Sequence, residues 1–203
     1  MTDSPSSGNT RKIPQERLVR TDADLAPRSS RKPPPAQGNS TDACANLRID
    51  VQFLDPHASV GEAEIASAVR EACRLAGARE GWVEISVVDD ERIQELNRQH
   101  LQHDYPTDVL SFCYLWDPDG GQLEGELIIS STTADRLAAA EGSLAADELL
   151  WYAVHGALHL CGYEDDQPVA WQRMRAAEAV VLQRLGLSRP AGFDEPRREW
   201  VDR

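Results

Sequence analysis

The sequence predicts one α+β domain in which a small mixed sheet of four strands packs against helices. Two observations favour this class. Short segments in which apolar and polar residues alternate are interspersed with longer segments whose apolar residues recur every three to four positions. Their order along the chain is β-α-β-α-β-β-α-α-α, which suits a mixed sheet with helices packed against it. The 203 residues are enough for one such domain with a substantial core.

The first four elements alternate between strand and helix, at 47–53, 60–76, 82–88 and 89–100. Apolar residues at alternating positions indicate the two strands, LRIDVQF and WVEISVV. Ser59 and Glu62 have the spacing of a capping box that begins the first helix, and Gly77 ends this helix. The second helix begins at the aspartates of DDERIQELNRQH, because an aspartate side chain can cap free backbone N–H groups.

Five elements follow, at 108–115, 126–130, 132–140, 143–161 and 168–186. DVLSFCYL and ELIIS predict two strands, which the turn-forming residues DPDGGQ separate. Thr132 or Thr133 is expected to begin the third helix, and Ser143 to cap a long apolar helix that runs to about Cys161. Pro168 suits the first position of the last helix, because no partner is needed there for the N–H that proline lacks.

Both ends of the chain differ in composition from the predicted domain, residues 46–187. Residues 1–45 hold six of the twelve prolines and show no hydrophobic periodicity, which predicts a disordered tail; residues 188–203 predict a polar C-terminal tail. Residues 1–45 carry seven Lys and Arg against five Asp and Glu, a charge of +2. The remainder carries fourteen against twenty-nine, a charge of −15, and the two sum to the net charge of −13. Such a charge repels polyanions at long range, and binding to nucleic acid therefore requires a local basic strip. The candidates for this strip are Arg92, Arg98 and Arg136.

Several classes of protein are disfavoured by composition. The chain has no run of about 18 apolar residues, so no membrane span is expected. Its N-terminus lacks the apolar segment of a secretion signal. The four scattered cysteines form no CxxC pair, which predicts reduced thiols rather than a disulfide scaffold. A cytoplasmic protein is therefore expected.

The stretch HGALHLCGYEDD has the pattern of a metal site. His155 and His159 are four residues apart, so one helix face carries both imidazoles and can bind one ion. Gly162 permits the left-handed conformation that ends a helix and lets the chain return a carboxylate to the ion. Asp165 holds the place of the last ligand in the H-E-x-x-H-x-x-G-x-x-H spacing of metalloproteases. The alternatives for the third ligand are Glu164 and Asp166.

Two imidazoles and one carboxylate leave a position open for water, as catalytic zinc sites do. The alternative is that both histidines are hydrogen-bonded core residues, but their spacing and the acids that follow favour a metal. The general base of the protease motif is a glutamate, and Gly156 stands in its place. Glu148 lies on the same helix face but about 10 Å away along the axis. Water would therefore be activated by the ion itself or with the help of a group from elsewhere.

Three segments, in this order along the chain, resemble the YbeY family of bacterial endoribonucleases. LNRQHLQHDYPTDVLSF, at 96–112, resembles L-N-x-x-Y-R-x-x-D-x-P-T-D-V-L-S-F, and EGELIIS, at 124–130, resembles L-G-D-I-V-I-S. VHGALHLCGY resembles the beginning of H-G-x-L-H-L-x-G-Y-D-H. The resemblance covers about residues 46–187.

This resemblance implies a zincin-like fold with the metal on a central helix. The cofactor would be one Zn²⁺ ion per chain, held by His155, His159 and Asp165. The family's activity implies cleavage of single-stranded RNA in the maturation of the 16S rRNA 3′ end and in ribosome quality control. The implied partner is the small ribosomal subunit, in the cytoplasm, rather than DNA or a membrane. Under the resemblance, the candidates for lining the cleft are Thr107, Asp108, Ser111 and His103. Without the resemblance, Thr107 and Asp108 would be interpreted as structural residues that cap and orient the entry to a strand.

The sequence also departs from the family's pattern. Asp165 stands where histidine is usual, which makes the ion a weaker Lewis acid and widens the suitable metals towards manganese or iron. Leu101 stands where the family has an arginine tied to RNA cleavage, and leucine cannot grip a phosphate. Glu126 replaces aspartate, and His100 replaces tyrosine. Two alternatives follow: a catalytically weakened ribosome-assembly binding factor that keeps its metal site, and a zinc metalloprotease, which Gly156 argues against.

Overall fold

The computed structural model of the protein describes residues 17–18, 44, 46–190 and 193–194. The predicted N-terminal tail therefore lies outside the described residues apart from Arg17, Leu18 and Cys44, and so do residues 191–192 and 195–203 of the predicted C-terminal tail.

Five strands and five helices are formed by the described residues. The strands are β1 (Arg17–Leu18), β2 (Asn46–Phe53), β3 (Glu80–Val88), β4 (Val109–Asp117) and β5 (Gln122–Ser130). The helices are α1 (Glu62–Ala76), α2 (Asp90–Leu101), α3 (Ser131–Glu141), α4 (Ala145–Leu160) and α5 (Pro168–Leu185). From β2 onward the predicted order of elements is confirmed, and with it the α+β class.

The strands form one sheet in the order β1-β4-β5-β3-β2. β2, β3 and β5 run parallel, whereas β4 pairs with β5 in the antiparallel direction, so the predicted mixed sheet of four strands is confirmed. The two-residue strand β1 extends the sheet in parallel beside β4, which the sequence did not predict. β5 also begins four residues earlier than expected, because its first half continues the pairing with β4 beyond the apolar ELIIS segment.

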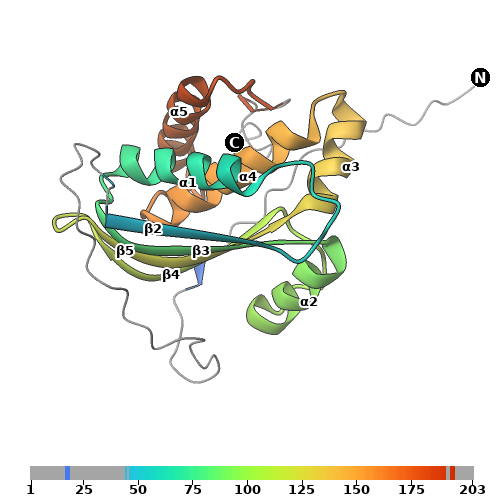
Figure 1. Ribbon diagram of the computed structural model, residues 1–203, viewed down its shortest axis with the longest axis horizontal. Helices are drawn as coiled ribbons and strands as arrows, with labels where there is room; N and C mark the ends of the chain where they lie inside the picture. Colours follow the sequence, from blue (N-terminus) through green and yellow to red (C-terminus); the bar gives the residue numbers. More distant parts are fainter. Residues whose placement is uncertain (1–16, 19–43, 45, 191–192, 195–203) are drawn as a thin grey trace, which may run out of the picture.

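The helices lie on both faces of the sheet but unequally. Figure 1 shows α1 and α4 across one face with α5 beyond them, α3 at one end, and α2 alone against the opposite face. Helix α4 is the centre of the domain, since twelve of its sixteen residues are buried. It packs against the sheet and against α1, α3 and α5. The apolar sequence of α4 is therefore explained by neighbours on several sides rather than by a membrane.

Two glycines allow α4 to lie close to the sheet. A Cβ atom on Gly125 of β5 would stand 2.9 Å from the methyl carbons of Leu160, and one on Gly156 of α4 would stand 2.8 Å from Cγ2 of Val109. Real Cβ atoms do not approach other heavy atoms this closely. The helix that carries both histidines is therefore fixed tightly against the strands.

A second apolar cluster joins α2 to the other face of the sheet. Its buried members are Val88, Ile93, Leu110, Phe112 and Ile128. Leu101, the last residue of α2, packs against this cluster together with Leu96 and Tyr114. Leu101, which stands where the resemblance places an arginine, thus contributes apolar packing.

The predicted caps of α1 and α4 were wrong. Helix α1 is capped by Gly61 rather than Ser59: the backbone N–H of Gly61 donates to the Glu64 carboxylate at 2.9 Å, so the acid of the capping box is Glu64 and not Glu62. Helix α4 begins after Leu144, because the Ser143 hydroxyl instead donates to the buried Glu148 at 3.0 Å.

The third helix begins at Ser131, one or two residues before the predicted Thr132 or Thr133. Ser130 caps it by accepting a hydrogen bond from the backbone N–H of Thr133 at 3.1 Å. The predicted first position of the last helix, Pro168, is confirmed.

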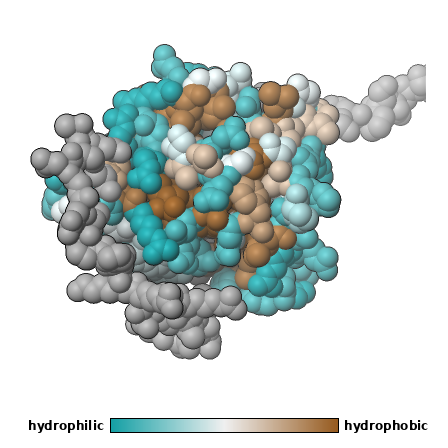
Figure 2. Space-filling view, viewed as in Figure 1, coloured by the Kyte–Doolittle hydropathy of each residue, from teal (hydrophilic) through white to brown (hydrophobic). Residues whose placement is uncertain are grey.

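None of the helices in the described ranges is long and apolar enough to cross a membrane. On the face seen in Figure 2, hydrophobic patches are separated by hydrophilic residues.

The cap of α2 is as predicted and can be tested. Oδ1 of Asp89 accepts a hydrogen bond from the backbone N–H of Arg92 at 2.8 Å. We expect Asp89→Ala to lower the free energy of unfolding by about 1 kcal/mol, because an N–H at the helix start loses its partner. Urea unfolding followed by circular dichroism measures this loss. Glu91→Ala, in the same exposed turn, is the control, and an equal loss in the two variants would contradict the capping role.

Candidate metal centre

The structure brings three of the predicted site residues together. His155, His159 and Asp165 each offer one ligand atom, and these atoms lie within 4.8 Å of one another. Within the described ranges of the chain, no other group of three or more His, Cys, Asp or Glu residues has this geometry. Of the three acids that follow the helix, Asp165 is the one that joins the histidines, and it is 1% exposed.

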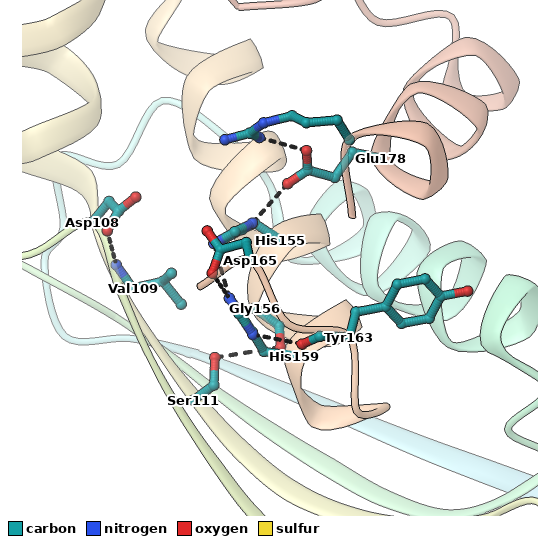
Figure 3. A network of polar contacts seen from close by, with 10 residues as sticks. Asp108, Val109, Ser111, His155, Gly156, His159, Tyr163, Asp165 and Glu178 are labelled. Atoms are coloured by element: carbon teal, nitrogen blue, oxygen red, sulfur yellow. Dashed lines mark hydrogen bonds and ion pairs between the residues drawn. The ribbon is translucent and has the colours of Figure 1, made fainter. Parts of the chain in front are cut away.

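The local fold explains how Asp165 reaches the histidines. Helix α4 ends at Leu160, and Gly162 adopts the left-handed conformation with φ of +81°. The backbone N–H of Tyr163 then donates to the carbonyl of Leu158 at 3.1 Å, which closes the turn. A residue with a side chain is strained at this φ, so the glycine is needed for the chain to reverse. Asp165 consequently returns beside the last turns of the helix (Figure 3).

The hydrogen bonds of the two imidazoles determine which nitrogen faces the cluster. Nδ1 of His155 donates to Oε1 of Glu178 at 2.6 Å, and Nδ1 of His159 donates to the backbone carbonyl of Tyr163 at 2.8 Å. A carboxylate and a carbonyl only accept, so both Nδ1 atoms carry hydrogen. The two Nε2 atoms face each other at 3.1 Å, and Oδ1 of Asp165 lies 3.7 Å from Nε2 of His159 (Figure 3).

Burial and charge act differently on the two imidazoles. Burial, with help from the neighbouring His155, lowers the pKa of His159 to about 4. Burial also acts to lower the pKa of His155, but the hydrogen bond and charge of Glu178 outweigh it and raise this pKa above its ordinary value. His159 is therefore held neutral, the form in which imidazole binds metals. Two ring nitrogens and a carboxylate at this spacing match the ligand set of a divalent transition metal, with zinc well suited.

The predicted cleft residues at the start of β4 lie beside α4. The Ser111 hydroxyl donates to the carbonyl of Gly156 at 3.3 Å. Asp108 is buried, and burial raises the pKa of its carboxyl, although the charge of His155 acts in the opposite direction. Oδ1 of Asp108 accepts from the Thr107 hydroxyl at 3.0 Å and from the backbone N–H of Val109 at 2.9 Å. These bonds hold the entry to the strand, and a role of Thr107, Asp108 and Ser111 in lining the cleft stays a prediction.

His103 is placed differently from the other cleft candidates. It lies between α2 and β4, where its ring stacks on Tyr105 with centroids 5.4 Å apart. Its Nδ1 also lies 3.1 Å from the Tyr105 hydroxyl. Both of these contacts are with Tyr105 and neither involves the metal cluster. His103 therefore forms an aromatic pair with Tyr105 on the segment that connects α2 to β4.

Two arginines of the predicted basic strip are engaged with carboxylates. Arg92 pairs with Glu95 at 2.6 Å, and Arg136 lies 3.7 Å from Asp90. Exposed pairs of this kind are weak, so both guanidinium groups can exchange a carboxylate for a phosphate. The basic strip stays a prediction.

Sequence analysis missed Glu178. It lies on α5, 23 residues after His155, and it is fully buried. A signal for it exists in the sequence, because Glu178 lies within the helical stripe formed by Met174, Ala177, Val181 and Leu182, all of which are buried. An acid in such a stripe is a buried charge, and a buried charge requires a partner.

Comparison with known proteins shows the family of this chain. The family model described as "Endoribonuclease YbeY" matches residues 50–186. A relative of that name from Rhodopirellula baltica is 36% identical over 165 residues, which cover 77% of this chain and 84% of the relative. Others come from Moorella thermoacetica, at 40% identity over 64% of this chain and 92% of the relative, and from Geobacillus thermodenitrificans, at 35% over 70% and 100%.

Among solved structures, a Thermotoga maritima protein known from its solution structure matches with a TM-score of 0.45. It is 22% identical, and the match covers 71% of this chain and 98% of that protein. The family model spans most of the domain, and the relatives match along most of their own length. The protein therefore belongs to the YbeY family of endoribonucleases.

Proposed function

We propose that this enzyme is a zinc-dependent endoribonuclease that cuts single-stranded RNA in the maturation of the 16S rRNA 3′ end and in ribosome quality control, in the cytoplasm. The observation that carries the proposal is the convergence of three ligand atoms, from His155, His159 and Asp165, within 4.8 Å in a chain of this family. The small ribosomal subunit is the proposed partner.

The residues of this chain have separable parts in the proposed reaction. His155 and His159 would hold the zinc through Nε2, and Asp165 would contribute the third ligand and a negative charge. A zinc ion with three protein ligands supplies a Lewis acid and lowers the pKa of water that it binds. Ser111, through its bond to the Gly156 carbonyl, keeps the start of β4 against the helix that carries the ligands. RNA enters against a strongly negative body, so local arginines are needed to hold its phosphates.

One observation favours a second candidate, an assembly factor that binds the ribosome but cleaves weakly. Leu101 is the residue that replaces the family's arginine, and it packs into the apolar cluster beneath the sheet. It offers no charge to a phosphate in the transition state. A protease has no such support, because Gly156 lies against Val109 and leaves no space for the glutamate base of that motif.

The proposed function is tested with purified protein that has been stripped of metal and reloaded with Zn²⁺. We expect the reloaded enzyme to cleave single-stranded RNA, to leave duplex RNA and casein intact, and to lose activity in chelator. His159→Ala is expected to abolish cleavage because it removes one ligand. His57→Ala, an exposed histidine on a loop, is the matched control and should cleave like the native enzyme.

Each other outcome of this experiment has a definite meaning. Zinc bound at native affinity without cleavage of free RNA favours the assembly factor, and binding to small subunits then becomes the next measurement. Faster cleavage with Mn²⁺ or Fe²⁺ than with Zn²⁺ reassigns the metal. Casein cleavage restores the protease alternative.

A further inference from the structure

A buried ion pair on α5 lies directly behind the candidate metal centre. Oε1 of Glu178 accepts the 2.6 Å hydrogen bond from Nδ1 of His155, and Oε2 accepts one from Nη1 of Arg175 at 2.5 Å. The Glu178 side chain is completely buried, and that of Arg175 is 11% exposed. Figure 3 shows Glu178 on the side of His155 that faces away from Asp165.

Glu178 and Arg175 form this pair inside the domain, and each oxygen of the carboxylate has a partner. A buried pair of ions contributes little to stability compared with apolar residues of the same volume. Because the neighbouring buried residues of α5 are apolar, packing alone would be served as well by another apolar residue. An acid at this position, bonded to His155, therefore points to a role other than packing.

Arg175 is itself held in place by aromatic rings. Its guanidinium carbon lies 5.1 Å from the ring centroid of Trp151 and 5.1 Å from that of Phe193. Trp151 belongs to α4, one helical turn before His155, and Phe193 comes from the segment after α5. Cation–π contacts of this kind stabilise a guanidinium that has lost water. The chain of contacts from these rings through Arg175 and Glu178 ends at Nδ1 of His155.

We propose that Glu178 is a positioning residue for the metal ligand His155, and that Arg175 acts through Glu178. By accepting the Nδ1 hydrogen, the carboxylate fixes the ring orientation and presents the lone pair of Nε2 to the ion. A charged acceptor also makes the imidazole a stronger donor to a metal. His159 has only the neutral carbonyl of Tyr163 in this position, so the two histidines differ in strength. The inference rests on the proposed metal centre and is independent of the RNA that the enzyme cuts.

The test measures affinity for Zn²⁺ by competition with a chromophoric chelator, without RNA. We expect Glu178→Gln to bind Zn²⁺ about 10- to 100-fold more weakly than the native protein, the range found for partners of metal-binding histidines. Glu71→Gln is the matched control, because Glu71 also pairs with arginines, Arg74 and Arg184, but on the surface. The control should bind zinc like the native protein.

Glu178→Gln leaves the buried Arg175 without its carboxylate, which can prevent folding. The double variant Glu178→Gln, Arg175→Met removes that charge while keeping an apolar contact with the rings. Circular dichroism establishes that it is folded, and its Zn²⁺ affinity is expected to fall by the same factor. Nitrogen-15 NMR adds a direct readout: His155 in the zinc-loaded native protein should keep its hydrogen on Nδ1, and a mixture of tautomers is expected in the metal-free double variant.

A folded double variant that binds Zn²⁺ within twofold of the native protein would overturn the positioning role. If the native protein itself binds no Zn²⁺, the metal centre fails and the inference fails with it. If the native protein binds zinc but cuts no RNA, the proposed function fails while the affinities of these variants still decide the role of Glu178.

Discussion

Gly156→Glu is expected to yield no folded protein. A Cβ atom at this position would stand 2.8 Å from Cγ2 of Val109, 2.9 Å from Cδ2 of Leu127 and 3.1 Å from the hydroxyl of Ser111. All three atoms belong to the sheet, so α4 would have to move away from it. Overpacking costs about 1–3 kcal/mol, and an unpaired carboxylate in this core costs several more. Together they approach the roughly 5–15 kcal/mol by which a domain is stable.

Thermal unfolding monitored by circular dichroism measures this effect. Val169→Glu, an exposed position on α5, is the control and should melt close to the native protein. Gly156→Ala should fall between the two, because the helix gains about 1 kcal/mol in propensity while the contact with Val109 is compressed. A Gly156→Glu variant that melts like the control would show that the helix is not held against the sheet as described. Restoring the protease glutamate is thus expected to destroy the fold before it can create a peptidase.

Asp165→Ala is expected to remove both bound zinc and RNA cleavage. The carboxylate is buried and is the one acidic member of the ligand cluster. Loss of a hydrogen-bond partner behind a ligand already weakens metal binding about 10- to 100-fold, so loss of the ligand itself should exceed this range. Two imidazoles alone leave the ion open to competing water and chelators. Competition with a chelator measures the affinity, and cleavage of single-stranded RNA measures the activity.

Two further variants sharpen this prediction. Asp166→Ala removes the neighbouring exposed acid and should change neither quantity. Asp165→His introduces the residue that is usual in the family and should retain zinc, with cleavage at least as fast as native, because a neutral ligand leaves the ion a stronger Lewis acid. Zinc binding that survives Asp165→Ala but not Asp166→Ala would transfer the ligand role to the other acid.

Much of the fold could be predicted because strand and helix periodicity are local properties of sequence. The cluster of His155, His159 and Asp165 was predictable for the same reason, since the three residues lie within one turn-and-helix segment of fixed spacing. Glu178 was not, because its proximity to His155 depends on how α5 packs against α4. The start of α4 was misplaced because Ser143, a good capping residue, is engaged by the carboxylate of Glu148. Rules based on nearby sequence identify the possible hydrogen-bond partners of a side chain. Tertiary packing determines which of these partners it contacts.

Because α4 lies deep within the domain, we expect the three candidate ligands to differ in how easily their backbone opens to solvent. His155 and His159 belong to the most enclosed helix, whose amide hydrogens should exchange with solvent only when the whole domain unfolds. Asp165 is also buried, but it lies beyond the end of that helix on a connecting turn, where we expect local opening to require less free energy than unfolding of the helix. Exchange of the metal would therefore proceed through brief opening of this turn while both imidazoles stay in place. The rate of metal exchange would then depend on the turn, and the geometry to which the metal returns would depend on the helix.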